Sequence, residues 1–471
     1  MKIDYLKKLR DGESLSTKEL LLMTISLSIP AIFAQISSII MAYIDAAMVG
    51  HLGSGEAASI GLMASSTWLL GGLCMAVSIG FTVQIAQAIG AKKEREARNL
   101  VRLGLGVASL SSSLLLLIGV AISNGLPAWL GGEIAIQQNA SIYFFIFALS
   151  LPLVQINSIA GGMLQSSGNI KLPSLLHIVA CGLDVVFNAL LIFPSWSFHL
   201  FGLEIVIPSA GLGVAGAALG TALAELVIAC LMLYFLLVKS PMLHLRKGER
   251  CQCARQYLQR ALQLALPVGF EQVVMCGAQI AATKIVAPLG MASIAANAFS
   301  VTAESLCYMP GYGIGVAAST LIGQSIGAKR NDLTRRLAWI TTALGMGIMA
   351  GTGILMYIFA PQMIGILSPD ETIRQLGTTI LRIEAFAEPL YAASIVANGV
   401  FRGAGDTLVP SCMNFVSMWC VRIPLAALLA NSLALEGVWI AMCLELCFRG
   451  SIFLIRLKSH RWENKSLQKA A

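Results

Sequence analysis

The stretch LSIPAIFAQ at Leu27–Gln35 returns later in the chain as LALPVGFEQ at Leu264–Gln272. Pro30 and Pro267 are thereby separated by 237 residues in a chain of 471. The same offset pairs Gln87 with Gln324, Gly90 with Gly327, Lys92 with Lys329, Pro152 with Pro389, Gly168 with Gly405 and Pro173 with Pro410. A constant offset of this kind indicates an internal duplication without insertions through the fifth helix of each half.

The composition is typical of a protein that crosses a membrane many times. Hydrophobic residues make up 57% of the chain and charged residues 12%, and the mean hydropathy is +0.78. A helix needs about 20 apolar residues to cross the hydrocarbon core. The long unbroken apolar runs favour helices over barrel strands. We predict twelve spans, near residues 20–49, 57–89, 98–123, 138–163, 172–193, 213–238, 260–287, 293–325, 335–359, 373–401, 408–430 and 437–457.

The duplication predicts the arrangement of these helices. Six helices per half is an even number, so both halves enter the membrane from the same side and form a parallel repeat. We therefore expect an all-α polytopic membrane protein with twelve transmembrane helices in two six-helix bundles and a cleft between them. The expected parts are a cytoplasmic N-terminus (1–19), an N-lobe (20–238), a cytoplasmic inter-lobe loop (239–259), a C-lobe (260–457) and a cytoplasmic tail (458–471).

The distribution of Lys and Arg predicts the orientation. Alternate connections and the two ends of the chain hold 26 of the 32 Lys and Arg, whereas the opposite connections hold none. Short loops rich in these residues stay on the cytoplasmic side. We expect a multi-pass membrane protein with both termini cytoplasmic, and we interpret the net charge of +8 as a topology signal rather than a nucleic-acid footprint.

Motifs for enzymatic chemistry are missing from the sequence. The outer connections hold none of the 11 cysteines, so no disulfide framework is expected. The CQC at Cys251–Cys253 has no second ligand pair, which disfavours a metal site. We find no nucleophile motif, phosphate loop or His cluster with metal spacing, and we expect neither an enzyme nor a cofactor.

Polar residues inside the predicted N-lobe helices are candidates for ion coupling. Asp45 shares one helical face with Gln35, and Asp184 and Asn188 form a polar stripe on the fifth helix. An ionisable group at mid-membrane costs about 2.5–3.5 kcal/mol on insertion scales, so each is a functional candidate. Desolvation would favour a protonated carboxyl at Asp45. The alternative role for these residues is a hydrogen bond between helices.

The predicted C-lobe also carries buried charges. Glu445 and Arg449 are spaced for an ion pair within one helix, and Glu384 or Glu388 could pair with Arg422. Glu271 and Glu304 lack an obvious partner in sequence, which leaves open that they face the cleft and attract a cationic substrate. The weaker candidates for substrate contacts are Gln35, Gln155, Asn157, Glu271, Gln272, Glu304 and Tyr391.

Several motifs together resemble one transporter family. They are P-x4-Q in both repeats, D-x3-VG-x-LG from Asp45 to Gly53, MPGYGIGVAASTLIGQSIGAK at Met309–Lys329 and NGVFRGAGDT at Asn398–Thr407. Over nearly the whole chain this pattern is similar to the multidrug and toxic compound extrusion (MATE) family. The resemblance implies a two-lobed antiporter that exports organic, often cationic, drugs in exchange for H⁺ or Na⁺, with Asp45 in ion coupling and Pro30 as the hinge of the first helix.

The chain departs from the sodium-coupled branch of that family in the C-lobe. Met275 and Tyr391 stand where that branch carries carboxylates, and the repeat copy of Asp45 is Ala282. We therefore expect H⁺ coupling. A Na⁺-coupled antiporter, with Na⁺ at Asp45 and Asp184, and a lipid-linked sugar flippase of the same superfamily are the alternatives. The expected partners are small-molecule drugs, toxic organic cations and the lipid bilayer, with no nucleic acid, and we expect a monomer.

Overall fold

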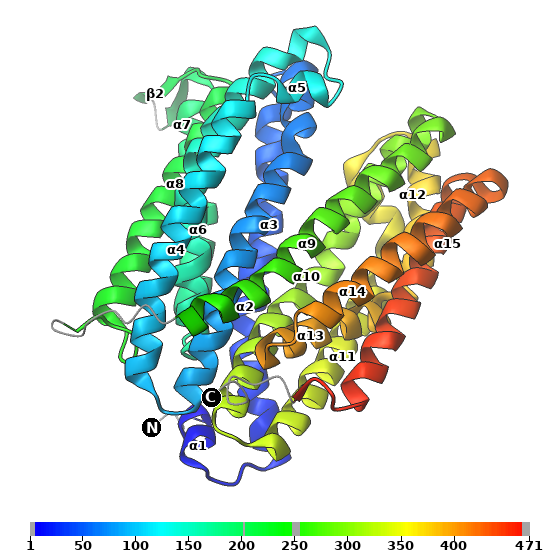
Figure 1. Cartoon of the computed structure of the whole chain (residues 1–471). Coiled ribbons are helices and arrows are strands. Elements are labelled where there is room, and N and C mark those ends of the chain that lie inside the picture. Colours follow the sequence, from blue (N-terminus) through cyan, green and yellow to red (C-terminus); the bar gives the residue numbers. More distant parts are fainter. Residues whose placement is uncertain (1–4, 201–202, 247–254, 464–471) are drawn as a thin grey trace.

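The computed structural model describes residues 5–200, 203–246 and 255–463. Figure 1 shows long helices in two groups that meet at one end of the molecule and diverge toward the other. We call the first of these the α1 end, because it holds the short helix α1 (Tyr5–Asp11), and the second the α5 end, after α5 (Leu126–Trp129). Residues Cys251–Cys253 of the CQC motif lie outside the described residues.

The N-lobe is the bundle formed by the first group of long helices. Its members are α2 (Thr17–Gly50), α3 (Ser54–Gly90), α4 (Glu94–Ile122), α6 (Ile134–Ser166), α7 (Lys171–Leu191) and α8 (Val214–Tyr234), which continues into the π-helical turn η1 (Phe235–Lys239). A hairpin of β1 (Pro194–Leu200) and β2 (Leu203–Ala210) joins α7 to α8. Ser16 caps α2 through a capping box with Glu19, which explains why the first span begins there.

The C-lobe is the second bundle. Its members are α9 (Arg255–Val286), the turn η2 (Ala287–Leu289), α10 (Met291–Gly327), α11 (Asn331–Leu367), α12 (Glu371–Glu384), α13 (Glu388–Ala404), α14 (Leu408–Phe415), the π-helical turn η3 (Val416–Arg422) and α15 (Ile423–Lys458). Nine helical stretches of the described residues are long and apolar enough to span a membrane. One of them, Leu408–Lys458, has 51 residues, enough for two passes. With α10 and the pair α12–α13, the total is the expected twelve.

Three C-lobe spans differ in detail from the sequence prediction. The tenth span, expected as one helix over 373–401, is interrupted between Glu384 and Glu388, because Pro389 starts the new helix α13. The eleventh and twelfth spans, expected with a loop between 430 and 437, are joined as α15 with a sharp break at Ala434, which has φ 50° and ψ −130°. The first break divides one span, whereas the second separates two spans that the helix assignment joins.

The backbone confirms the internal repeat. Lys92 and Lys329 both adopt the left-handed conformation at φ 60°, and they are separated by the repeat offset. Gly168 and Gly405 are likewise paired, at φ 93° and 83°. A long side chain in the left-handed region is uncommon. Its recurrence at equivalent turns shows that the two halves share one fold.

The two lobes meet at a reciprocal crossing of α3 and α10 near the α1 end. A methyl group on Gly90 would lie 2.1 Å from the Gln324 carbonyl oxygen, and one on Gly327 would lie 2.0 Å from the Gln87 carbonyl oxygen. These are repeat-related contacts, made in both directions. Only glycine permits so close an approach of two helix backbones.

Glutamine side chains extend this crossing. Gln87 Nε2 donates to the Gly403 carbonyl at 3.2 Å, and Gln324 Nε2 donates to the Ser166 carbonyl at 2.8 Å. The four residues obey the same repeat relation, so each lobe makes the same bond to the other. We refer to Gln87, Gly90, Gln324 and Gly327 as the α3–α10 crossing.

Surface groups secure the α1 end further. Lys92 Nζ lies 2.7 Å from Asp11 Oδ1 of α1, and this hydrogen bond lowers the pKa of Asp11. From the C-lobe, Arg330 donates to the Glu13 carbonyl at 3.2 Å. The segment around α1 therefore contacts both lobes where they meet.

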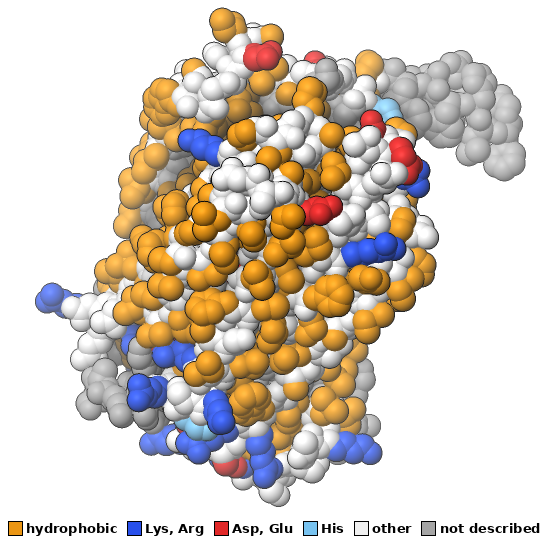
Figure 2. Space-filling view, turned by 90° about the vertical axis from the view of Figure 1, so that its right-hand side faces the viewer, with side chains coloured by type: hydrophobic (Ala, Val, Ile, Leu, Met, Phe, Trp, Pro, Cys, Tyr) orange, Lys and Arg blue, Asp and Glu red, His pale blue; other side chains and the backbone are white. Residues whose placement is uncertain are grey.

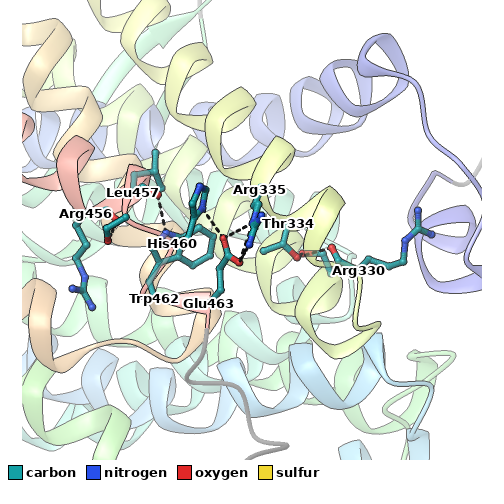
Figure 3. A network of polar contacts seen from close by, with 10 residues as sticks. Arg330, Thr334, Arg335, Arg456, Leu457, His460, Trp462 and Glu463 are labelled. Atoms are coloured by element: carbon teal, nitrogen blue, oxygen red, sulfur yellow. Dashed lines mark hydrogen bonds and ion pairs between the residues drawn. The ribbon is translucent and has the colours of Figure 1, made fainter.

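The chain after α15 folds back on the C-lobe (Figure 3). Arg335 pairs with Glu463 at 2.9 Å, and His460 contacts the same carboxylate at 2.8 Å. Trp462 is fully buried and donates to the Leu457 carbonyl. On the face drawn in Figure 2, hydrophobic side chains cover the middle of the molecule and Lys and Arg gather at the lower end, as expected for a protein embedded in a bilayer.

Replacing glycine by alanine should change the thermal stability in opposite directions inside and outside the α3–α10 crossing. In an ordinary exposed helix, Gly→Ala is stabilising by about 0.5–1 kcal/mol. Gly90→Ala and Gly327→Ala should instead lower the thermal unfolding temperature in detergent, because the new methyl group overlaps a carbonyl oxygen, and overpacking costs about 1–3 kcal/mol. Gly106→Ala is the control, since no atom lies within 4 Å of its added methyl group. Unchanged melting of both crossing variants would contradict the contact.

Candidate functional site

The three predicted coupling residues come together inside the N-lobe. Asp45 lies on α2, and Asp184 and Asn188 lie one turn apart on α7, which packs against α2. Asn188 Nδ2 donates to Asp45 Oδ1 at 2.9 Å and to Asp184 Oδ2 at 3.0 Å. Asp184 and Asn188 are each 1% exposed, whereas Asp45 is partly accessible. We call these three residues the carboxylate pocket.

The geometry of the carboxylate pocket limits its charge. The Asn188 amide supplies a hydrogen bond to each carboxyl, and the two carboxyls also interact directly with each other. Among the described residues, Asp184 Oδ1 and Asn188 Oδ1 have no hydrogen-bond partner. Two adjacent carboxylates in a low-dielectric site cannot both stay ionised without compensation. The arrangement therefore suits the uptake of a proton or a small cation.

Close packing of α8 holds the pocket in place. A methyl group on Gly220 of α8 would lie 2.1 Å from Asn188 Oδ1, so a larger residue there would displace the amide. Because the amide is confined from this side, its NH₂ group points at the carboxyls of Asp45 and Asp184.

A second polar pair in the N-lobe includes a residue that the sequence analysis missed. Asn157 of α6 donates to both the backbone carbonyl and the side-chain carboxylate of Glu225 on α8. Asn157 was expected to touch substrate, but here it joins two helices. Glu225 could have been found, since it is an ionisable residue within the predicted span 213–238.

The other N-lobe candidates lie in different surroundings. Gln155 is fully buried and donates to the Cys74 carbonyl and to Ser78 Oγ, both at 3.1 Å, so it joins α6 to α3. Gln35 is partly exposed on α2. Pro30 lies within α2, which runs through it as one unbroken helix. Close to it, Gly313 of α10 meets the backbone of Ile32.

In the C-lobe, Glu271 has the partners that the sequence analysis did not find. Its carboxylate accepts from Asn414 Nδ2 at 2.7 Å, Ser411 Oγ at 3.0 Å, Asn398 Nδ2 at 3.3 Å and Arg402 Nη2 at 3.4 Å. Glu271 therefore has partners in the fold, although its neighbours in sequence offered none. The donors come from α13 and α14, too far along the chain for a spacing rule to reveal.

The remaining candidates for substrate contacts lie on α10 or on neighbouring helices. Gln272 is mostly buried, and its side chain lies where a methyl group on Gly72 of α3 would be, so it belongs to the lobe interface. Glu304 is 5% exposed on α10. The Tyr391 ring lies 5.6 Å from that of Tyr308, with the Arg449 guanidinium 5.4 Å from its centre.

Of the ion pairs predicted for the C-lobe, the one between Glu445 and Arg449 is confirmed. Arg449 pairs with Glu445 at 3.0 Å, as the spacing indicated. The carboxylates of Glu384 and Glu388 are buried, and within the described part of the chain their oxygens have no hydrogen-bond partner. Arg422 donates instead to the Met442 sulfur at 2.7 Å.

These features define a class of protein. Two parallel-repeat helical bundles meet at one end, diverge at the other, and both hold buried ionisable residues within their membrane spans. This is the architecture of a secondary transporter that works by alternating access.

Comparisons with known proteins identify the family. The MatE family profile matches residues 30–190 and 267–428, one match in each repeat. The chain belongs to this family, the MATE transporters, which are not enzymes.

Individual relatives agree with this assignment. The chain is 27% identical over 455 residues to the probable multidrug resistance protein NorM of Thermotoga maritima, covering 94% of this chain and 93% of the relative. It is 24% identical to the protein of the same name from Bacillus cereus, over 94% of this chain and 97% of the relative. The crystal structure of the Vibrio cholerae MATE transporter VcmN in the bent form matches with a TM-score of 0.85 and 20% identity, over 96% of this chain and 99% of that one.

The contacts of Glu271 lead to a prediction about its role. Glu271→Gln replaces an acceptor of four hydrogen bonds by an amide whose NH₂ group faces other donors. Leaving buried donors without an acceptor costs about 1–3 kcal/mol each, and more for charged groups. We expect a clear drop in the thermal unfolding temperature, with ethidium binding retained below it. Glu371→Gln is the control, because the side chain of Glu371 is 70% exposed. Wild-type melting with lost ethidium binding would instead make Glu271 a substrate ligand.

Proposed function

We propose that the protein exports organic, often cationic, drugs across the bacterial plasma membrane in exchange for H⁺. The observation that carries this proposal is the carboxylate pocket, where Asn188 joins Asp45 to Asp184. The relatives named as multidrug resistance proteins support drugs as the substrate class.

Asymmetry between the lobes supports a coupling role for the carboxylate pocket. The repeat positions of Asp45 and Asp184 are Ala282 and Val421, and that of Asn188 is Leu425. The fold is built in the C-lobe without this pocket, so the pocket serves something other than folding. An intramembrane acid that the fold does not need is best explained by ion binding.

The orientation belongs to the same proposal. The α1 end carries the Lys- and Arg-rich connections around Lys92, Lys93, Lys329 and Arg330, so it is the cytoplasmic end. In this orientation the α3–α10 crossing joins the lobes at the cytoplasmic end, and their helices diverge toward the outside. We expect the protein to act as a monomer, since each chain contains both lobes.

The transport cycle follows from the geometry. A proton enters from the side on which the lobes diverge and binds Asp45, since Asp45 is the accessible member. With one carboxyl neutral, the two no longer repel each other, so α2 bends at Pro30, where the ring removes one backbone hydrogen bond. Bending narrows the N-lobe side of the cleft and expels the drug. The α3–α10 crossing then opens, and Asp45 loses its proton to the cytoplasm.

Sodium is the second candidate for the coupling ion. Asp184 Oδ1 and Asn188 Oδ1, unpartnered within the described residues, are oxygen atoms that a sodium ion could use. Among the described residues, however, no group of three or more acidic, His or Cys side chains is arranged to hold a metal ion. A two-carboxyl pocket with a shared amide fits a proton better.

Ethidium transport in proteoliposomes tests this proposal. We expect a pH gradient without sodium to drive wild-type transport. Asp45→Asn keeps the side-chain shape but cannot exchange a proton, and it should slow gradient-driven transport by roughly 5- to 150-fold, the usual range of coupling free energies. Asp332→Asn, at the exposed start of α11, is the control and should transport normally. Full proton-driven transport by Asp45→Asn would refute proton coupling through Asp45, and transport driven only by a sodium gradient would favour the sodium alternative.

A further inference from the structure

The C-lobe contains a small pocket at the position equivalent to the carboxylate pocket. It is formed between α9, α10, η3 and α15, and Ala282, the repeat copy of Asp45, lines it. Arg422 also lines it and directly follows Val421, the repeat copy of Asp184. The duplication has therefore kept the place of the pocket while exchanging its acidic group for a guanidinium.

Arg422 dominates the electrostatics of this pocket. The other polar residues of its wall are Gln279, Thr283, Asn297 and Trp439, and none of the lining residues is acidic. The Arg422 guanidinium donates to the Met442 thioether, which is a weak acceptor. Glu304 and Glu384 interact with Arg422 electrostatically, but neither forms an ion pair with it. The guanidinium therefore retains donors for an anionic ligand.

The position of the pocket makes it accessible to substrate. In the C-lobe, α9 packs against α3 and α10 packs against α2, so the pocket lies between the two helices that face the N-lobe. The contact of Gln272 with Gly72 marks where α9 still touches the N-lobe. Gln279 and Thr283 lie two to three turns farther along α9, where the lobes diverge (Figure 1), and both are exposed.

Size and chemistry limit the ligand. The pocket is only large enough for a few atoms, each about the size of a water molecule. It therefore accepts one small substituent of a drug rather than the whole drug. A planar guanidinium binds a carboxylate with two parallel hydrogen bonds. The amides of Gln279 and Asn297 offer further donors to the same group.

We propose that the Arg422 pocket binds the carboxylate of zwitterionic or anionic amphiphilic substrates. This proposal rests on the proposed function in one respect, namely that the drug passes through the cleft between the lobes. The two lobes then differ in charge preference, since the N-lobe pocket exchanges protons and the C-lobe pocket holds an acidic group of the substrate. This site extends the substrate range beyond organic cations.

Binding of a matched pair of dyes tests the proposal. Rhodamine B carries a free carboxylate, and its ethyl ester carries the same cationic ring system without it. Fluorescence polarisation with purified protein in detergent measures both affinities. Arg422→Gln should weaken rhodamine B binding by about tenfold or more, since hydrogen bonds to a charged group contribute about 1.5–3 kcal/mol. The ester should change less than about twofold. Lys284→Gln removes an exposed cation of α9 that does not line the pocket, and it should change the binding of neither dye.

A second variant guards against misfolding of Arg422→Gln. Ala282→Asp restores the N-lobe pattern and places a carboxylate beside Arg422, so it should block rhodamine B and spare the ester. Equal loss of both dyes in the two variants, or unchanged rhodamine B binding, would overturn the proposal. These measurements use no ion gradient, so they can fail while proton-driven ethidium transport succeeds, and the converse also holds.

Discussion

The α3–α10 crossing is the contact on which the rest of the structure depends. Gly90 and Gly327 let the two helix backbones approach very closely. Each glycine lies against the backbone carbonyl of the crossing glutamine of the other lobe. The glutamine side chains then bond to carbonyls of the opposite lobe. Because all of these contacts are repeat-related, the lobes are joined by a self-complementary surface at one end. The separation at the other end follows, since helices that touch at one point diverge away from it.

The internal symmetry makes the differences between the lobes informative. Packing glycines, left-handed turns and crossing residues recur at the repeat offset, so they are requirements of the fold. Charged residues within the membrane do not recur. Asp45 becomes Ala282, and Arg422 follows a position where the N-lobe has Asp184. A duplicated scaffold with opposite charges in its two equivalent pockets can couple an ion in one lobe and recognise substrate in the other.

Much of the fold was predictable from the sequence, because apolar length and a constant offset are local signals. The twelve spans and the parallel repeat follow from them, and the comparisons confirm the family and the fold. The grouping of Asp45, Asp184 and Asn188 was a reasonable expectation, since Asp45 lies on a polar face of the first predicted helix, and the other two lie on a polar stripe of the fifth. Partners from distant helices were not predictable. Glu271 illustrates this, because its four donors depend on the packing of α9 against α13 and α14.

The central claim is that the charge state of the N-lobe carboxylate pocket controls the α3–α10 crossing. Spin labels at positions 95 and 332, exposed residues at the starts of α4 and α11, report the separation of the lobes at the α1 end by double electron–electron resonance. The exposed Cys230, Cys412 and Cys420, together with Cys251 and Cys253, which lie outside the described residues, are first replaced by serine. Asp45→Asn, which mimics the protonated acid, should shift the distance distribution toward longer values. If the Asp45→Asn variant gave the same distance distribution as the wild-type protein at every pH, the result would contradict the account.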